Sequence, residues 1–179
     1  FVGGTPTFTP GIADSALVCV SGTSYTTSIS TLPLGNSART VSLWMKSNLS
    51  SGQPNIFNYG GNGNGNKFGL YFNTSNGKLT FQGFGLNYDQ EINNTNIFSN
   101  TWYHLALVYT GKFVQVYVNG VLKESFQRDI NTAPNNMLFT LGGFGGLVDD
   151  LRIYNRALSE NDVAAIYAAP ETTCTIIPP

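Results

Sequence analysis

Short runs of alternating apolar and polar residues, separated by turn residues, recur along the chain. The sharpest example is Val118-Asn119-Gly120-Val121, where a two-residue Asn-Gly turn joins two such runs. Asn and Gly adopt the positive φ angles of a tight hairpin turn, so this pattern predicts two adjacent antiparallel strands. Many short strands bounded by turns favour an all-β sandwich. The predicted strands fall within residues 15–22, 39–47, 54–61, 67–75, 78–85, 102–111, 112–120, 121–127, 137–144 and 147–155.

One segment near the end of the chain has the pattern of a helix. Ser159 and Asp162 have the spacing of a capping box, and Val163 and Ile166 fall on one face of the turns that follow. Pro170 marks the end, because proline cannot continue a helix. We therefore expect one short C-terminal helix and no second domain.

Charge and hydropathy exclude two classes of partner. Charged residues make up 11% of the chain, and the net charge is -1 at pH 7. Binding to nucleic acid or to an anionic membrane surface favours clustered Lys and Arg, which this balance does not provide. No apolar run reaches the roughly 20 residues that a membrane helix needs. We expect neither nucleic-acid binding nor membrane insertion.

Asp149 and Asp150 stand side by side in a run that otherwise reads as a buried strand. Successive side chains of a strand point to opposite faces, so the two carboxylates cannot jointly flank one substrate bond. Asp150 shares its face with Arg152, and a surface ion pair is the expected arrangement. Asp149 shares its face with Leu151 and needs compensation for burial. Backbone N–H groups, an arginine such as Arg156, and a calcium ion all stay open as its partner.

Residues with catalytic chemistry are few and scattered. His104 is the only histidine, and its strand-like surroundings predict a packed or partly exposed side chain rather than a zinc ligand. No G-x-S-x-G motif is present to supply a nucleophilic serine. A glycoside hydrolase needs two carboxylic acids about 5–9.5 Å apart across the sugar, and the glutamates show no such pairing. We expect a protein without enzymatic activity.

Two segments rich in Gly and Asn carry the residue types of a sugar-binding rim. Residues 58–69 read NYGGNGNGNKFG, and residues 83–91 read GFGLNYDQE. Tyrosine rings stack on sugar rings while amides and carboxylates hold the hydroxyls. The alternatives are a solvated loop for the first segment and ordinary strand packing for the second. The candidate ligand-binding residues are Tyr59, Asn62, Asn64, Tyr88 and Asp89.

Cys19 and Cys174 lie near opposite ends of the chain. The first and last strands of a sandwich often lie together, so a disulfide is geometrically reasonable, and closing so long a loop contributes roughly 4–5 kcal/mol. Two independent thiols are the alternative. Residues 1–11 and 169–179 are rich in Pro and Thr and have the composition of linker margins. These features suggest an exported piece of a larger multidomain protein.

Three segments taken together resemble a known family. The order and spacing are those of laminin-G-like domains of the concanavalin A-like lectin/glucanase superfamily. The segments are RTVSLWMKS (39–47), NTWYHLALVYTGKFVQVYVNGVLKES (100–125) and LGGFGGLVDDLRIYNRALSENDVAAIY (141–167). The resemblance covers about residues 12–168. It implies one jelly-roll domain over this range, built as a sandwich of two antiparallel sheets.

The resemblance also implies a function. Such domains usually are non-catalytic modules of secreted or surface proteins, often bacterial, and many bind glycans. We therefore expect a lectin-like carbohydrate-binding module that works beside the other domains of a bacterial secreted or cell-surface protein. A structural or protein-interaction spacer of a surface adhesin is the alternative. Some members bind calcium at the sandwich rim, which makes Asp149 and Asp150 the calcium candidates, although Ser21 stands where many members have Asp.

Overall fold

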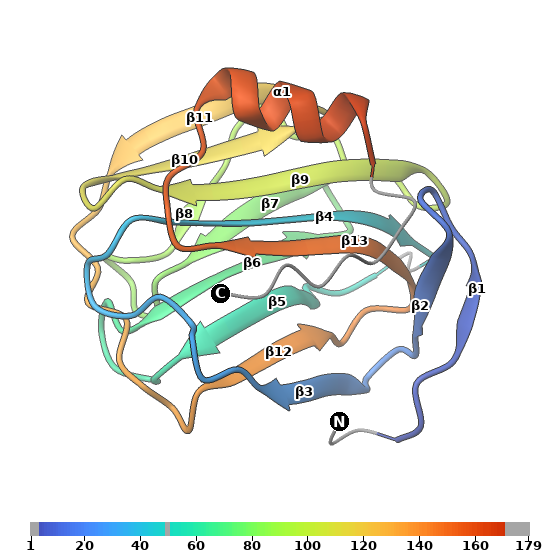
Figure 1. The fold of residues 1–179 in the computed structure, drawn as a ribbon, viewed down its shortest axis with the longest axis horizontal. Coiled ribbons are helices and arrows are strands. Elements are labelled where there is room, and N and C mark those ends of the chain that lie inside the picture. Colours follow the sequence, from blue (N-terminus) through green and yellow to red (C-terminus); the bar gives the residue numbers. More distant parts are fainter. Residues whose placement is uncertain (1–3, 49–50, 171–179) are drawn as a thin grey trace.

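Two antiparallel β-sheets lie face to face, and one short helix covers the outer side of one of them (Figure 1). The computed structural model describes residues 4–48 and 51–170. The elements are β1 (Phe8–Pro10), β2 (Ser15–Cys19), β3 (Ser24–Ser28), β4 (Arg39–Ser47), β5 (Asn55–Gly60), β6 (Lys67–Asn73), β7 (Lys78–Gln82), β8 (Gln90–Glu91), β9 (Trp102–Tyr109), β10 (Phe113–Val118), β11 (Val121–Gln127), β12 (Leu138–Gly142), β13 (Gly146–Tyr154) and α1 (Glu160–Ala168).

The strand order confirms the predicted jelly-roll sandwich. One sheet has the order β1-β2-β13-β4-β9-β10-β11, and the other has the order β3-β12-β5-β6-β7-β8. The Asn119-Gly120 hairpin joins β10 to β11, with φ angles of 50° and 76°. Strands β1, β3 and β8 were not predicted, and all three lie at sheet edges. An edge strand can be short and polar because solvent covers one side of it. β1 also shows that the fold begins before residue 12.

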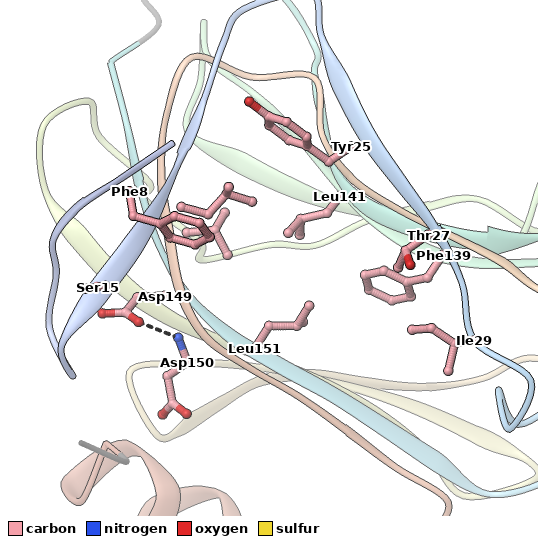
Figure 2. A pocket seen from close by; sticks show the side chains of 12 residues that line it. Phe8, Ser15, Tyr25, Thr27, Ile29, Phe139, Leu141, Asp149, Asp150 and Leu151 are labelled. Atoms are coloured by element: carbon pink, nitrogen blue, oxygen red, sulfur yellow. Dashed lines mark hydrogen bonds between the residues drawn. The ribbon is translucent and has the colours of Figure 1, made fainter. Parts of the chain in front are cut away.

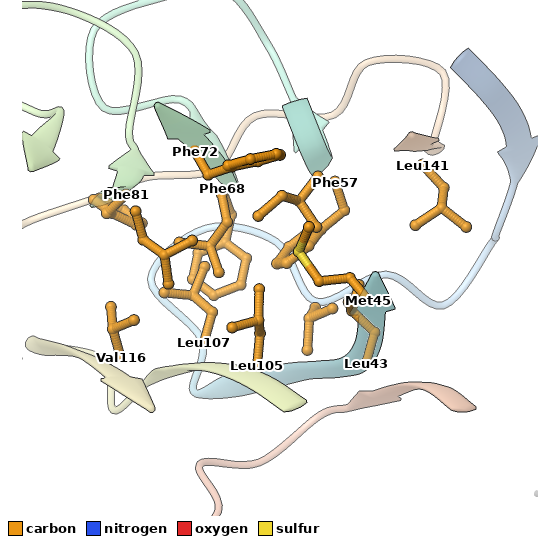
Figure 3. Packing of buried hydrophobic residues seen from close by; sticks show 14 of the residues in the cluster. Leu43, Met45, Phe57, Phe68, Phe72, Phe81, Leu105, Leu107, Val116 and Leu141 are labelled. Carbon is orange, nitrogen blue, oxygen red and sulfur yellow. The ribbon is translucent and has the colours of Figure 1, made fainter. Parts of the chain in front are cut away.

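The core fills the space between the two sheets (Figure 3). Phe57, Phe68 and Phe81 of one sheet meet Leu43 and Leu105 of the other. The aromatic rings also contact each other, with 6.5 Å between the centroids of Phe57 and Phe68. Each such side chain stabilises the fold by roughly 1.5–3 kcal/mol when fully buried. This packing holds the two sheets as a rigid base for the side chains on their outer faces.

The helix packs on the outer face of the seven-stranded sheet. The predicted capping box is present: Ser159 Oγ accepts from the Asp162 N–H at 3.2 Å, and Asp162 accepts from the Ser159 N–H at 3.0 Å. An apolar cluster joins the helix and the segment before it to this face. The cluster consists of Ala106, Val108, Tyr117, Leu158 and Val163. The helix therefore closes part of one outer face, on the seven-stranded sheet.

Arg39 is completely buried at the start of β4. Its guanidinium lies over the rings of Phe68 and Tyr109, at 5.4 and 5.5 Å from their centroids. It donates hydrogen bonds to the Thr132 hydroxyl and to the carbonyl oxygens of Pro33, Leu34, Gly35 and Ser37. These oxygens compensate the positive charge, so Arg39 ties residues 33–37 and Thr132 to the two sheets.

We expect Arg39→Lys to lower the free energy of unfolding by roughly 3–5 kcal/mol, because a lysine cannot reach this set of acceptors and leaves several unpaired. Urea denaturation followed by tryptophan fluorescence measures the change. Arg156→Lys is the matched control, since Arg156 forms an exposed ion pair with Asp162. The control should unfold at the wild-type urea concentration. A wild-type midpoint for Arg39→Lys would contradict this role.

His104 is the packed side chain that its sequence context predicted. It is 2% exposed and lies against the rings of Trp44 and Tyr167, with 5.5 and 5.8 Å between centroids. Burial lowers the pKa of His104 to about 4, and the charge of Arg152 contributes in the same direction. The imidazole is therefore neutral in the folded protein near neutral pH.

This pKa predicts a stability change on mild acidification. Between pH 6.5 and 4 the unfolded chain protonates His104 while the folded protein does not, so the free energy of unfolding falls by up to roughly 3 kcal/mol. His104→Phe should remove that part of the pH dependence. The measurement is the urea midpoint of both proteins at several pH values in this window. Parallel pH profiles of the two proteins would show that His104 is not responsible.

Candidate functional site

The outer face of the six-stranded sheet carries a row of polar residues, here called the polar strip. Strand register places Thr26, Thr140, Asn58, Gly69 and Gln82 opposite one another on β3, β12, β5, β6 and β7. Their neighbours in sequence point into the core, so these alternate positions point outward. With strands about 4.8 Å apart, the strip crosses roughly 19 Å of sheet. It presents hydroxyl and amide groups along its length.

Gly69 allows Asn58 to pack closely in the middle of the polar strip. A Cβ atom at this position would lie 2.6 Å from the carbonyl oxygen of Phe57 and 2.6 Å from Cβ of Asn58. A larger residue therefore cannot be accommodated without moving β5. The absence of a side chain leaves room for the side chain of Asn58, which packs against Gly69.

A polar hollow of about 210 Å³ lies beside the strip, toward the β8 edge. It is lined by Gln53, Tyr71, Asn73, Thr80, Asp89, Gln90 and Glu91. Tyr71 and Thr80 are cross-strand neighbours on β6 and β7. Burial raises the pKa of the Tyr71 hydroxyl, a hydrogen bond with Thr80 lowers it, and the charges of Asp89 and Glu91 raise it. The hollow adds an aromatic ring and acceptor oxygens to the polar groups of the strip.

Two loops at one end of this sheet pack against each other. The ring of Tyr88 lies over Gly65, where a Cβ atom would come within 2.6 Å of the ring. The side chain of Asn64 lies against Gly85 in the same way, at 2.5 Å from a Cβ placed there. Residues 61–66 and 83–89 therefore form one surface. The structure thus brings together Asn64, Tyr88 and Asp89, and their role in ligand binding stays a prediction.

Asp89 connects the second loop to the polar hollow. Its Oδ1 accepts a hydrogen bond from the Phe84 N–H at 2.8 Å. Phe84 has a φ angle of 69°, a left-handed conformation that is rare for a bulky residue. Lys67, the first residue of β6, places its Nζ 4.9 Å from the centroid of the Phe84 ring. Asp89 therefore both lines the hollow and holds the loop in its conformation.

Tyr59 is not a surface residue, and its predicted role in ligand binding is wrong. It is 2% exposed and packs in the core against Phe68 and Phe139, at 5.7 and 6.1 Å between centroids. It belongs to β5 rather than to a loop, and the alternation of that strand turns Asn58 outward instead. Asn62 is exposed on the loop of residues 61–66. Tyr88 is half-buried and lines a second hollow beside Arg128.

The residues of the polar strip and Tyr71 were not singled out by their sequence. The available signal was a polar or small residue at most of the alternate positions of β5, β6, β7 and β12. This alternation indicates which residues face outward. It does not indicate that residues from strands far apart in the sequence form one row.

Asp149 takes its partners from the backbone, one of the alternatives left open. Its Oδ2 accepts from the N–H groups of Ile12 and Ala13 at 2.7 and 2.9 Å, and its Oδ1 accepts from the Asp150 N–H at 2.8 Å. Asp150 forms the predicted ion pair with Arg152, which donates from Nε and from a terminal nitrogen at 2.7 and 2.8 Å. A bulge in β13 between Asp149 and Arg152 interrupts the regular alternation.

An apolar cleft of about 260 Å³ opens beside these carboxylates at the edge of the sandwich (Figure 2). Phe8, Tyr25, Phe139, Leu141 and Leu151 are among the residues that line it. Each oxygen of the two carboxylates at its end already accepts a hydrogen bond from a protein N–H group. The cleft therefore offers few polar groups to a sugar.

The same hydrogen bonds bear on the predicted calcium site. N–H groups directed at a carboxylate leave little room for a cation, so the residues around Asp149 and Asp150 do not fit a calcium site well. Within residues 4–48 and 51–170, no three His, Cys, Asp or Glu side chains are grouped to hold a metal ion. Calcium binding stays a prediction.

The predicted disulfide also stays a prediction. Cys19 is buried, 3% exposed, at the end of β2. Burial raises the pKa of its thiol to about 12. Cys174 lies outside the residues that the structure describes, as does most of the predicted C-terminal linker margin.

Comparison with known protein families shows which superfamily the chain belongs to. A family model described as the concanavalin A-like lectin/glucanases superfamily (Laminin_G_3) matches residues 21–164. The chain belongs to this superfamily. A comparison with curated protein sequences finds no match. Among the described residues, no helix has the length and apolar character that crossing a membrane requires.

Solved structures share the fold. Domain 4 of AbnA, a GH43 extracellular arabinanase from Geobacillus stearothermophilus, was solved in complex with arabinotriose. Its TM-score is 0.75 at 26% identity, over 92% of this chain and 82% of that one. The binding domain of Paraclostridial Mosquitocidal Protein 1 has a TM-score of 0.73 at 18% identity, over 93% and 46% of the two chains. The botulinum neurotoxin serotype D binding domain has a TM-score of 0.66 at 14% identity, over 87% of this chain and 42% of that one. The chain thus spans less than half the length of the two toxin structures.

We expect Asp149→Ala to lower the free energy of unfolding by about 3 kcal/mol, because the N–H groups of Ile12, Ala13 and Asp150 lose their acceptor. Urea denaturation measures the loss. Asp14→Ala is the control, since Asp14 is exposed on the same segment. Equal loss in both variants would contradict the anchoring role of Asp149.

The thermal unfolding midpoint of the wild type, measured with calcium and with a chelator, tests the metal prediction. From the hydrogen bonds around the carboxylates we expect the same midpoint in both conditions. An increase with calcium that disappears in Asp149→Asn would establish a site at this carboxylate.

Proposed function

We propose that the chain is a carbohydrate-binding module that binds a polysaccharide along the polar strip without cleaving it. We further propose that it belongs to a larger secreted or cell-surface protein. The observation that carries the proposal is the contrast between the two outer faces of the sandwich. Apolar residues of α1 and its approach segment cover part of one face, whereas a continuous row of hydroxyls and amides crosses the other.

The chemistry of the strip suits a hydroxyl-rich ligand. The amide of Asn58 offers a donor and an acceptor, and the hydroxyls of Thr26 and Thr140 offer both as well. The side-chain oxygen of Gln82 is buried and has no hydrogen-bond partner within the described protein. Gln82 therefore contributes its amide N–H groups as donors rather than this oxygen.

The shape of the face favours an extended chain over a single sugar. The strip crosses five strands at nearly right angles, and the neighbouring hollow offers the ring of Tyr71 as a stacking surface. A shallow, solvated site of this kind leaves many hydroxyls in water, so we expect an affinity in the roughly micromolar to millimolar range. The arabinotriose complex of the AbnA domain supports a sugar ligand and makes arabinan the first probe.

A protein-interaction role is the second candidate. Several large apolar side chains are exposed on loops, among them Leu86, which is fully exposed, and Phe98, which is 64% exposed. Leu86 lies in the loop of residues 83–89 that borders the proposed site. A partner protein that buries these side chains would favour the spacer or adhesion role.

We expect Gln82→Ala and Tyr71→Ala each to weaken binding to soluble arabinan or another polysaccharide of a neutral panel by about ten-fold, the loss of one hydrogen bond or one stacked ring. Affinity electrophoresis and titration calorimetry measure it, with calcium and with a chelator. Gln115→Ala is the matched control, because it removes the same amide from the other sheet.

Three results would count against the proposal. Absence of binding to every polysaccharide in both calcium conditions would leave the protein-interaction role. If Gln115→Ala weakens binding as much as Gln82→Ala does, the binding site does not lie on the polar strip. Release of sugar from the bound polysaccharide would contradict the non-catalytic role.

A further inference from the structure

We propose that Asp89 and Glu91 restrict the ligand of the polar strip to uncharged polysaccharides and exclude those that carry carboxylates. This inference rests on the proposed function, since it names the class of glycan that the same site accepts. It assigns to the two residues a role in specificity.

The two carboxylates lie where a chain on the strip reaches the β8 edge. Glu91 is the cross-strand partner of Thr80, and Thr80 is the partner of Tyr71. Glu91 is therefore two strands, roughly 10 Å, from the Tyr71 backbone, within reach of side chains between them. Asp89 lines the same hollow from the loop before β8.

The cations near this hollow do not give it a positive surface. Lys78 forms an exposed ion pair with Glu91, so its charge is already matched by one of the two carboxylates. Lys67 lies over the ring of Phe84, and burial lowers its pKa although the charge of Asp89 opposes this. No lysine or arginine lines the hollow itself.

The hydroxyl of Tyr71 lies in this hollow together with Asp89 and Glu91. Burial raises its pKa and the Thr80 hydrogen bond lowers it, and the charged groups that act on it, Asp89 and Glu91, are both negative. The members of the polar strip are uncharged. A ligand along this path thus meets neutral donors and acceptors first and negative charge at the end.

This arrangement separates two classes of glycan. A sugar hydroxyl can donate to a carboxylate oxygen of Asp89 or Glu91, which gives a short, charge-assisted hydrogen bond. A uronate group at the same place adds a negative charge, and no unpaired lysine or arginine lines the hollow to compensate it. Like charges placed together in a binding site are repelled and disfavour the wrong partner.

The test compares soluble arabinan, which is uncharged, with polygalacturonate, which is acidic, at low and at high ionic strength. The proteins are the wild type, Glu91→Gln, the double variant Asp89→Asn/Glu91→Gln, and Glu160→Gln. The last is the control, because Glu160 lies in the first turn of α1, which packs on the other sheet, and the substitution changes the net charge by the same amount as Glu91→Gln. Galactan and xylan complete the uncharged panel.

We expect the wild type to bind at least one uncharged polysaccharide about ten-fold or more tightly than polygalacturonate at low ionic strength. The double variant should gain about five-fold in affinity for polygalacturonate, and Glu91→Gln alone a smaller part of this gain. High ionic strength should reduce the difference between the wild type and the double variant. Glu160→Gln should behave as the wild type.

The outcomes separate this inference from the proposed function. Binding of polygalacturonate by the wild type as tightly as any uncharged polysaccharide overturns the inference and leaves the binding module intact. An unchanged preference in folded Glu91→Gln and in the double variant shows that these carboxylates do not set it. Failure of the wild type to bind any member of the panel overturns the proposed function, and this inference with it.

Discussion

The buried guanidinium of Arg39 organises the end of the sandwich that carries the candidate site. It donates to four carbonyl oxygens within residues 33–37 and to the hydroxyl of Thr132, which pairs with Gly35. The segment beside Thr132 then holds the first rim loop, because the Ala133 N–H donates to the Asn66 carbonyl at 3.1 Å. That loop supports the ring of Tyr88. A charge without access to water thus fixes loops that border the surface where we propose the ligand binds.

The two outer faces of the sandwich have different chemistry because they have different neighbours. Tyr117 and Val108 on the seven-stranded sheet are buried by Leu158 and by Val163 of α1, so apolar residues are stable there. The outward positions of the six-stranded sheet are mostly polar or small, and the row across its middle carries Thr, Asn, Gln and Gly. Folding of a sandwich depends on apolar packing between its two inner faces. The outer face of the second sheet is therefore free to carry binding groups, and its rim carries the acidic residues that we propose select the ligand.

Much of the fold followed from local patterns. The alternation in β4, β9 and β10, the Asn119-Gly120 turn and the capping box at Ser159 each use interactions between residues close in sequence, and each appears as predicted. The edge strands β1 and β3 were not predicted, because strands with one side in solvent need no apolar alternation. Tyr59 was misplaced for a related reason: the turn-rich residues after it suggested a loop, whereas its own position continues the inward alternation of β5.

The amino-acid sequence by itself determined the class of fold, the C-terminal helix, the family and the need of Asp149 for partners, because periodicity, capping and burial of charge act locally. Only the tertiary structure decided that those partners are the N–H groups of Ile12 and Ala13, far away in the chain. It also decided that Thr26, Asn58, Gln82 and Thr140 form one row. Strand register joins residues separated by long stretches of sequence, and packing of the whole sandwich sets that register.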